Sequence, residues 1–251
     1  MKPHKTQGWL NPHCPAEVVA QRASELCQLY RQAPQRWQQE GIRTVSTDEK
    51  TGIQALERNA RDKPLQVGQV RKQEYEYTRH GTLCLVANWD VAQGGIVHPT
   101  LSETRTEADF KYHIEHTVLS DPTVKQWCFV VDQLNTHQSE SLVRYVADLE
   151  GICADTLGVK GQSGVLRSMV SRQIFLRATT HRVYFVYTPK HCSWLNQIEI
   201  WFGILSRKLL RYGNFVSKSD LQSQLESFIS YFNAVLAKPF KWTYNGKPCT
   251  Q

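Results

Sequence analysis

Glu199 is the acidic residue whose position most clearly points to chemistry. Between Asp155 and Asp220 it is the only Asp or Glu, although the same interval contains ten Lys and Arg. The ten are Lys160, Arg167, Arg172, Arg177, Arg182, Lys190, Arg207, Lys208, Arg211 and Lys218. A solvated surface normally mixes the two signs of charge. A lone carboxylate here is expected either to pair with an arginine or to hold a metal ion beside a bound polyanion.

Two aspartates stand at the ends of predicted strands. Asp48 ends the segment IRTVSTD (42–48), and Asp132 ends QWCFVVD (126–132). The second segment is an apolar run without alternation, as expected of a central strand covered on both faces. Ends of central strands in a mixed sheet open into one crevice, where ligands commonly bind. With Glu199 near the start of the following helix, the three carboxylates are candidates for one site.

Carboxylates that converge in one crevice repel one another unless a cation is present. Hard oxygen ligands favour Mg²⁺ or Mn²⁺ over zinc. Two such ions about 4 Å apart can activate a water or a hydroxyl and stabilise the leaving oxygen of a phosphodiester during in-line displacement. The pattern therefore predicts Asp48, Asp132 and Glu199 as catalytic, metal-binding residues with two Mg²⁺ ions, for which Mn²⁺ can substitute.

Each acid also has a purely structural interpretation. Asp48 is compatible with a turn or a helix N-cap, and Asp132 with a turn. Glu199 is compatible with a buried ion pair to Arg207 or Lys190. These alternatives stay open at the level of the sequence.

Neighbouring polar residues complicate the choice of site. Asp90 also ends a predicted strand, but the following Gly94-Gly95 pair favours a hairpin turn there. Glu49 should point to the opposite face from Asp48 by strand alternation. His137, five residues after Asp132, is compatible with orienting a phosphate or a metal-bound water, and also with helix capping or packing.

Periodicity and turn residues predict an α/β chain. Strands are predicted over 42–48, 74–90, 93–100, 126–132 and 182–187. Helices are predicted over 15–32 (ended by Pro34), 106–120, from 133 to about 149, 165–178, four turns from an N-cap at Ser193, and about 218–236. A loop or short helical turn is predicted for 50–66, and a glycine-rich loop for 156–164. This order predicts a mixed five-stranded sheet with helices on both faces.

The positive charge belongs to the C-terminal part of the chain. Residues 1–140 carry 16 Lys and Arg against 17 Asp and Glu, whereas residues 141–251 carry 14 against 6. This bias favours a basic face for nucleic acid, with a solubilising surface as the alternative. Candidate backbone contacts are Lys160, Arg167, Lys190, His191, Arg207 and Lys208. Trp194 and Trp201 are expected in the core rather than as stacking platforms.

Seven cysteines without a CxxC pair favour reduced thiols in an intracellular protein over a disulfide framework. His13 beside Cys14 lacks a second pair at ligand spacing. No apolar run approaches membrane-spanning length, and the N-terminus lacks the apolar core of a signal peptide. A soluble intracellular protein is expected.

Four segments together resemble bacterial insertion-sequence transposases of the mariner-like superfamily. They are TDEKTGIQALER (47–58), VVDQLNTHQSE (130–140), YTPKHCSWLNQIEIWF (187–202) and AKPFKWTYNGKP (237–248). The resemblance implies a ribonuclease-H-like catalytic domain with a DDE triad of Asp48, Asp132 and Glu199. It also implies Mg²⁺-dependent cleavage at transposon ends and strand transfer into target DNA, in the cytoplasm and at the nucleoid.

The chain departs from that family pattern in three ways. Gln133 stands where relatives usually have Asn. The distance from Asp132 to Glu199 is 67 positions (199 − 132), longer than in many relatives, so a basic insertion is expected over about 151–178. The residues before Asp48 are too few for the usual helix-turn-helix region.

From the third departure, residues 1–40 are interpreted as a helical connector and residues 41–251 as the catalytic domain. We expect a homodimer, with the helix-turn-helix part encoded upstream. The alternative is a truncated, non-catalytic DNA-binding remnant that regulates or inhibits transposition.

Overall fold

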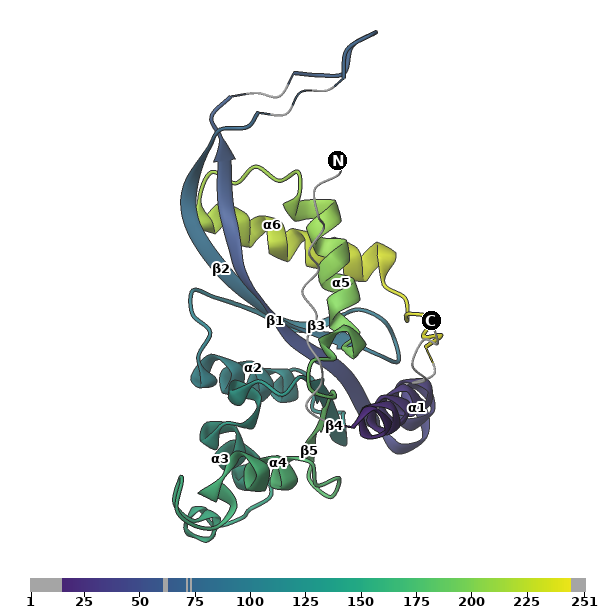
Figure 1. The fold of residues 1–251 in the computed structure, drawn as a ribbon, viewed down its shortest axis with the longest axis vertical. Coiled ribbons are helices and arrows are strands. Elements are labelled where there is room, and N and C mark those ends of the chain that lie inside the picture. The colour runs from purple at the N-terminus through teal and green to yellow at the C-terminus, as the bar shows by residue number, and fades with distance from the viewer. Residues whose placement is uncertain (1–14, 61–62, 71, 73, 245–251) are drawn as a thin grey trace.

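A mixed five-stranded sheet forms the centre of the computed structural model, which describes residues 15–60, 63–70, 72 and 74–244 (Figure 1). The strands are β1 (Ile42–Arg58), β2 (Tyr77–Asp90), β3 (Ile96–Ser102), β4 (Gln126–Val131) and β5 (Val183–Tyr187). They lie in the order β3-β2-β1-β4-β5. The first three pair antiparallel, whereas β4 runs parallel to both β1 and β5. This confirms the predicted sheet.

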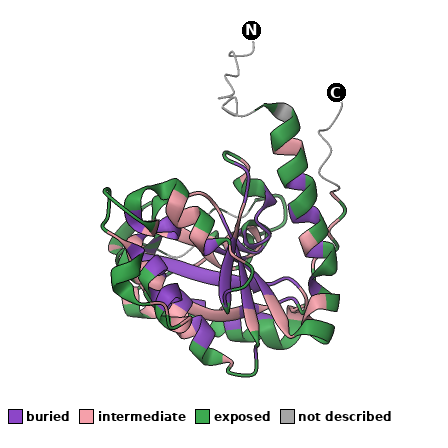
Figure 2. Ribbon diagram, turned by 90° about the horizontal axis from the view of Figure 1, so that it is seen from below, coloured by how far each residue is buried: buried purple, intermediate pink, exposed green. Residues whose placement is uncertain are grey.

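Helices cover both faces of the sheet, also as predicted. One face carries α1 (Ala16–Glu40), α5 (Ile198–Leu205) and α6 (Lys218–Tyr231), and the other carries α2 (Glu107–Ser120), α3 (Glu140–Leu149) and α4 (Met169–Leu176). Each face has its own apolar cluster, and β4 is buried along five of its six residues. Figure 2 shows the buried strands between helices whose outer surfaces are exposed.

The first strand is much longer than predicted. The segment 50–66 was expected to be a loop or a helical turn, but β1 continues to Arg58 and pairs with β2 along its length. Ile53 and Ala55 are buried against helices of the first face, and this tertiary packing outweighs the polar composition. A register shift between Lys50 and Ile53 accommodates Gly52, whose φ is 64°. The resulting hairpin projects from the body (Figure 1).

The N-terminal helix passes through the predicted stop at Pro34 and ends at Glu40. A proline inside a helix removes one backbone hydrogen bond and crowds the preceding turn. Here Tyr30 and Ala33 are buried in the core, and the Tyr30 hydroxyl donates to the Leu195 carbonyl oxygen over 2.9 Å. After Pro34, the Arg36 guanidinium donates to the Tyr184 hydroxyl over 2.7 Å. Tertiary contacts on both sides of Pro34 therefore hold the helix together.

The helix bearing Glu199 begins later than predicted. Ser193–Leu195 form a separate 3₁₀ turn, Ser193 makes no capping bond, and α5 starts at Ile198. The helix continues as a π-helical segment over Ser206–Leu210. The last helix, α6, is likewise extended by a π-helical segment, Phe232–Leu236, close to the predicted end.

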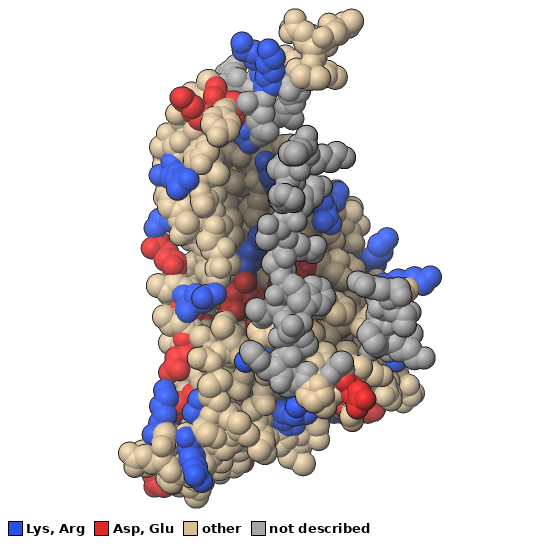
Figure 3. All heavy atoms as spheres, viewed as in Figure 1, with Lys and Arg blue, Asp and Glu red and all other residues tan. Residues whose placement is uncertain are grey.

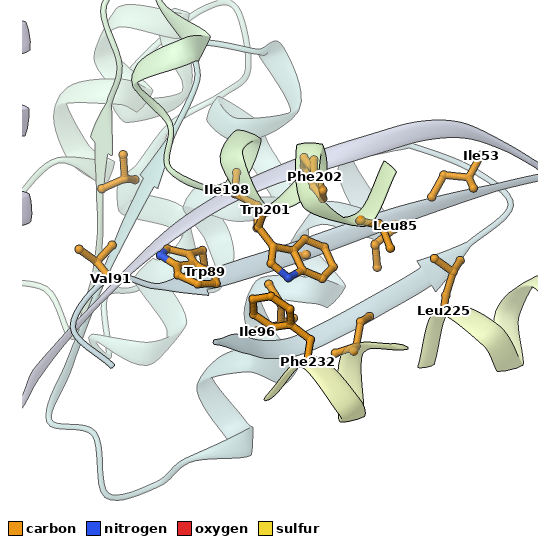
Figure 4. Close-up of a cluster of buried hydrophobic side chains, with 14 of the residues drawn as sticks. Ile53, Leu85, Trp89, Val91, Ile96, Ile198, Trp201, Phe202, Leu225 and Phe232 are labelled. Atoms are coloured by element: carbon orange, nitrogen blue, oxygen red, sulfur yellow. The ribbon is translucent and has the colours of Figure 1, made fainter. Parts of the chain in front are cut away.

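The C-terminal segment docks on the core as far as the structure describes it. The ring of Phe240 stacks on Trp89 with centroids 4.1 Å apart, and Trp242 meets Tyr30 edge-on at 5.2 Å. Figure 4 shows part of this core, in which Phe232 packs against both Trp89 and Trp201. Residues 237–244 thus pack on the core.

Among the described residues, the five cysteines are free thiols, and Cys27, Cys84 and Cys128 are buried. The His13-Cys14 pair lies outside the described residues. None of the helices in the described part of the chain has the length and apolar character needed to cross a membrane.

Replacing Gly94 by alanine should destabilise the protein through the docked tail. Gly94 has φ 71°, and an added Cβ would lie 2.0 Å from the Lys238 carbonyl carbon. At Gly52, where φ is 64°, an added Cβ would meet nothing within 4 Å. Both variants carry the left-handed backbone cost of about 1–2 kcal/mol. Gly94→Ala should cost a further 1–3 kcal/mol or so from overpacking, measured by urea unfolding. Equal losses in the two variants would contradict the docking described above.

Candidate active site

Asp48 lies where β1 extends past the end of β4. The two strands pair only as far as Ser46 opposite Val130, so no strand covers this edge of β1 at Asp48. The Asp48 side chain is buried, with 8% of the residue exposed. Its Oδ1 accepts a hydrogen bond from the backbone amide of Glu49 over 2.8 Å, and its Oδ2 is 3.4 Å from the side-chain Nδ2 of Asn196. These contacts orient the carboxylate toward the end of β4.

Asp132 is the first residue after β4. Its Oδ1 accepts a hydrogen bond from the Leu134 amide over 2.9 Å and lies 2.8 Å from His137 Nδ1. Partial burial by itself raises the pKa of Asp132, but the bonds from His137 and Leu134 outweigh it and lower the pKa below its ordinary value. Among the described residues, Oδ2 accepts no hydrogen bond, so one oxygen of this carboxylate is available to a ligand.

The two aspartates act on each other electrostatically. Burial, and then the neighbouring charge of Asp132, raise the pKa of Asp48 to about 7. Carboxylates held this close are the arrangement that a hard divalent cation would relieve. The donor set thus fits Mg²⁺ or Mn²⁺, as the sequence predicts.

Glu49 and His137 lie beside the aspartates, and Glu49 is on the opposite face of β1 from Asp48, as strand alternation predicts. Its Oε1 is 3.3 Å from His137 Nε2, and one atom from each of Asp48, Glu49 and His137 falls within 4.8 Å of the others. This convergence around the open edge of β1 is possible because β4 has already ended. Burial disfavours the charged imidazole, but bonds to Asp132 and Glu49 prevail and raise the pKa of His137 to about 10.

Glu199 is in the first turn of α5, and the structure leaves it exposed. In the described part of the chain its carboxylate makes no hydrogen bond or ion pair, so the alternative of a buried pair with Arg207 or Lys190 is wrong. The start of α5 is fixed to β1, since the Ile198 amide donates to Ser46 Oγ over 3.1 Å. Asn196 also donates to the Thr47 carbonyl oxygen over 2.8 Å. Glu199 therefore emerges next to the strand that carries Asp48.

A cleft of about 520 Å³ opens beside Asp132 between the loop after β5 and α4. Its lining includes Asp132, Gln133, Gln138, Thr188, Lys190 and His191. Gln133 spans the ends of β4 and β5, because its Nε2 donates to the Thr188 carbonyl oxygen over 2.8 Å. Two of the predicted phosphate contacts, Lys190 and His191, thus share a cleft with an acid of the predicted site.

The other predicted contacts lie elsewhere on the surface. Lys160 is 3.6 Å from Glu140, and Arg167 is exposed in the segment before α4. Arg207 and Lys208 are exposed on the π-helical segment after α5. Figure 3 shows Asp and Glu side chains in the middle of one face, with Lys and Arg side chains above and below them.

Other polar and aromatic candidates have structural roles. Asp90 pairs with Arg43 at 2.8 Å and accepts from the amides of Ala92 and Gln93, which confirms the turn assignment. Trp201 is fully buried, as predicted. The core prediction for Trp194 is wrong: 55% of it is exposed, with its ring edge-on to Tyr244 at 5.1 Å. The short 3₁₀ turn that holds it presents its ring outward.

One carboxylate within β1 and another just after the parallel strand β4, in a mixed sheet covered on both faces, fit an endonuclease-type catalytic domain. The model of the DDE superfamily endonuclease family matches residues 43–222, and the chain belongs to this family. A comparison with curated proteins found no match.

Solved structures show the same fold. The Mos1 mariner paired-end complex with Mn matches with a TM-score of 0.53 and 16% identity over 92% of this chain. The Mos1 paired-end complex with left transposon end and the Mos1 strand transfer complex each match with a TM-score of 0.51, at 15% and 14% identity over 92% of this chain. This chain covers 60%, 60% and 59%, respectively, of those Mos1 chains. The predicted ribonuclease-H-like fold is thereby confirmed.

Replacing Asp48 by asparagine should stabilise the metal-free protein at alkaline pH. The folded-state pKa of about 7 exceeds the ordinary value of 3.8, so the folded protein holds this proton more tightly than the unfolded chain. Wild-type stability is therefore lost as pH rises from about 4 to about 7 and stays low above that. Asparagine keeps an oxygen acceptor without the charge.

Thermal unfolding in EDTA should give a higher Tm for Asp48→Asn at pH 8 by a few degrees, and a difference near zero at pH 4. Excess Mg²⁺ should raise the wild-type Tm more than that of the variant. A variant that is less stable than wild type at pH 8 in EDTA would contradict the repulsion between the aspartates.

Proposed function

We propose that the protein is the catalytic domain of a DNA transposase, which cleaves phosphodiester bonds at transposon ends and transfers strands into target DNA. The observation that carries this proposal is the interaction of Asp48, within β1, with Asp132, which follows β4 and lines a cleft that also contains Lys190. Family membership and a fold shared with Mos1 transposase support it.

In this proposal Asp48, Asp132 and Glu199 hold two Mg²⁺ ions, or Mn²⁺ in their place. When bound, the ions activate the attacking oxygen and stabilise the leaving oxygen of the phosphodiester. Asp48 and Asp132 supply the fixed part of the site, because strands hold both. Glu199 completes it from the helix, where its exposed carboxylate is open to the DNA.

Phosphate contacts from the protein position the strand for this reaction. Lys190 and His191 reach the backbone from the cleft beside Asp132. Arg207 and Lys208 contact it beyond α5, and Lys160 and Arg167 contact it from the basic insertion of about 151–178. We further propose a homodimer, and a helix-turn-helix part that recognises the element ends. Residues 1–40 connect to that part and 41–251 are the catalytic domain, acting on the bacterial nucleoid.

Replacing Asp132 by asparagine should abolish metal-dependent nicking of supercoiled plasmid. Loss of one metal-binding carboxylate removes several kcal/mol of transition-state stabilisation, so the rate should fall at least about 100-fold. Asp48→Asn and Glu199→Gln should behave alike. Asp148→Asn makes the same chemical change on the exposed side of α3 and should keep the wild-type rate. Equal nicking by wild type and Asp132→Asn would reject the enzyme and favour the non-catalytic, DNA-binding alternative.

DNA affinity should fall steeply with salt, and Lys190 should account for part of that slope. Each phosphate contact contributes about 0.9 to the slope of log K against log salt, so Lys190→Ala should lower the slope by about 1. Lys125→Ala is the matched control, because Lys125 lies just before β4, at the end of that strand opposite Asp132. Fluorescence anisotropy with a labelled duplex measures both. A salt-independent affinity would count against the basic contacts.

A further inference from the structure

His137 forms a buried bridge between two carboxylates, and only one of them belongs to the proposed triad. Its side chain is fully buried, with Nδ1 2.8 Å from Asp132 Oδ1 and Nε2 3.3 Å from Glu49 Oε1. The Glu49 side chain is also buried, with 4% exposed. Each ring nitrogen therefore lies within hydrogen-bond distance of a carboxylate oxygen.

The orientation of the imidazole is fixed by its surroundings. The Phe110 ring lies against it with centroids 4.2 Å apart, and the Tyr187 hydroxyl donates to the His137 carbonyl oxygen over 2.9 Å. The His137 amide donates to the Leu134 carbonyl oxygen over 3.0 Å. The ring is thus held by a neighbouring helix, and the backbone of His137 by the last strand and by its own turn.

The terminal torsion (χ2) of an aspartate side chain has only a broad, shallow preference. An unrestrained carboxylate is therefore a poor metal ligand, because it is not kept in the orientation that the metal requires. Partners behind a ligand normally fix its orientation in metal sites. At Asp132 the contacts from His137 and Leu134 both use Oδ1. Rotation is thereby prevented, and Oδ2 remains for the metal.

We propose that His137 and Glu49 are positioning residues: His137 fixes the Asp132 carboxylate for metal binding, and Glu49 acts through His137 by holding its far nitrogen. The inference rests on the proposed function, since it assumes that Asp132 holds the metal. Within this proposal, Glu49 Oε1 lies 3.3 Å from His137 Nε2 and serves the imidazole rather than a metal ion. Adjacent residues of a strand point to opposite faces, so Glu49 leaves β1 on the other side from Asp48. The contact with His137 connects it to the site nevertheless.

Mn²⁺ binding, followed by electron paramagnetic resonance without DNA, tests this inference with a double-mutant cycle. Glu49→Gln and His137→Asn should each raise the Mn²⁺ Kd about tenfold, in keeping with the loss expected for such outer partners. If Glu49 acts through His137, the double variant should be no weaker than His137→Asn alone. Multiplying effects would overturn the proposal and make Glu49 an independent ligand. Single variants within twofold of wild type would overturn it too.

Glu57→Gln is the matched control, because Glu57 lies on the same strand and also contacts a histidine, with Oε2 2.7 Å from His80 Nε2. Its Mn²⁺ Kd should equal that of wild type. Thermal unfolding should show each variant folded at the assay temperature, and His137→Gln replaces His137→Asn if the latter unfolds. If the variants show these Mn²⁺ affinities but the wild-type protein does not nick DNA, the proposed function is rejected and the positioning role stands. A wild-type protein that binds no Mn²⁺ would overturn the positioning role itself.

Discussion

The early end of β4 is the constraint on which the site depends. This strand pairs with β1 only as far as Val130, and the chain leaves the sheet at Asp132. Beyond that point β1 has an open edge, and carboxylates from both of its faces converge there. Bringing Asp48 close to Asp132 costs free energy in the absence of a cation. Burial of apolar side chains on both faces of β4 stabilises the strands in these positions. This stabilisation offsets the repulsion between the two carboxylates.

In the proposed function, the negative charge of the aspartates and the positive charge of the basic residues have complementary roles. A DNA strand would be repelled by the paired aspartates and attracted by Lys190 and the other basic residues around them. A divalent cation in the centre removes the repulsion and leaves the attraction. Metal and DNA binding should therefore reinforce each other. Neither the acids nor the basic residues would suffice alone.

The proposed site combines three kinds of support. Asp48 is held within a strand, Asp132 at the end of another strand by its own turn and by His137, and Glu199 on a helix fixed to β1 through Ile198 and Ser46. Strands give the two aspartates fixed positions. The helix presents its carboxylate at the surface, where a substrate can reach it.

The sequence by itself determined the five-stranded sheet and the order of its elements, because apolar runs are local signals, whereas Asp48 proves to lie within β1 and not at its end. It also indicated the family. It failed for the long β1, for the helix through Pro34 and for the start of α5, since in each case distant packing overrides local preference. Only the tertiary structure placed Glu49 and His137 together behind Asp132. Alternation describes one strand, whereas that convergence depends on where a neighbouring strand, far away in the sequence, comes to an end.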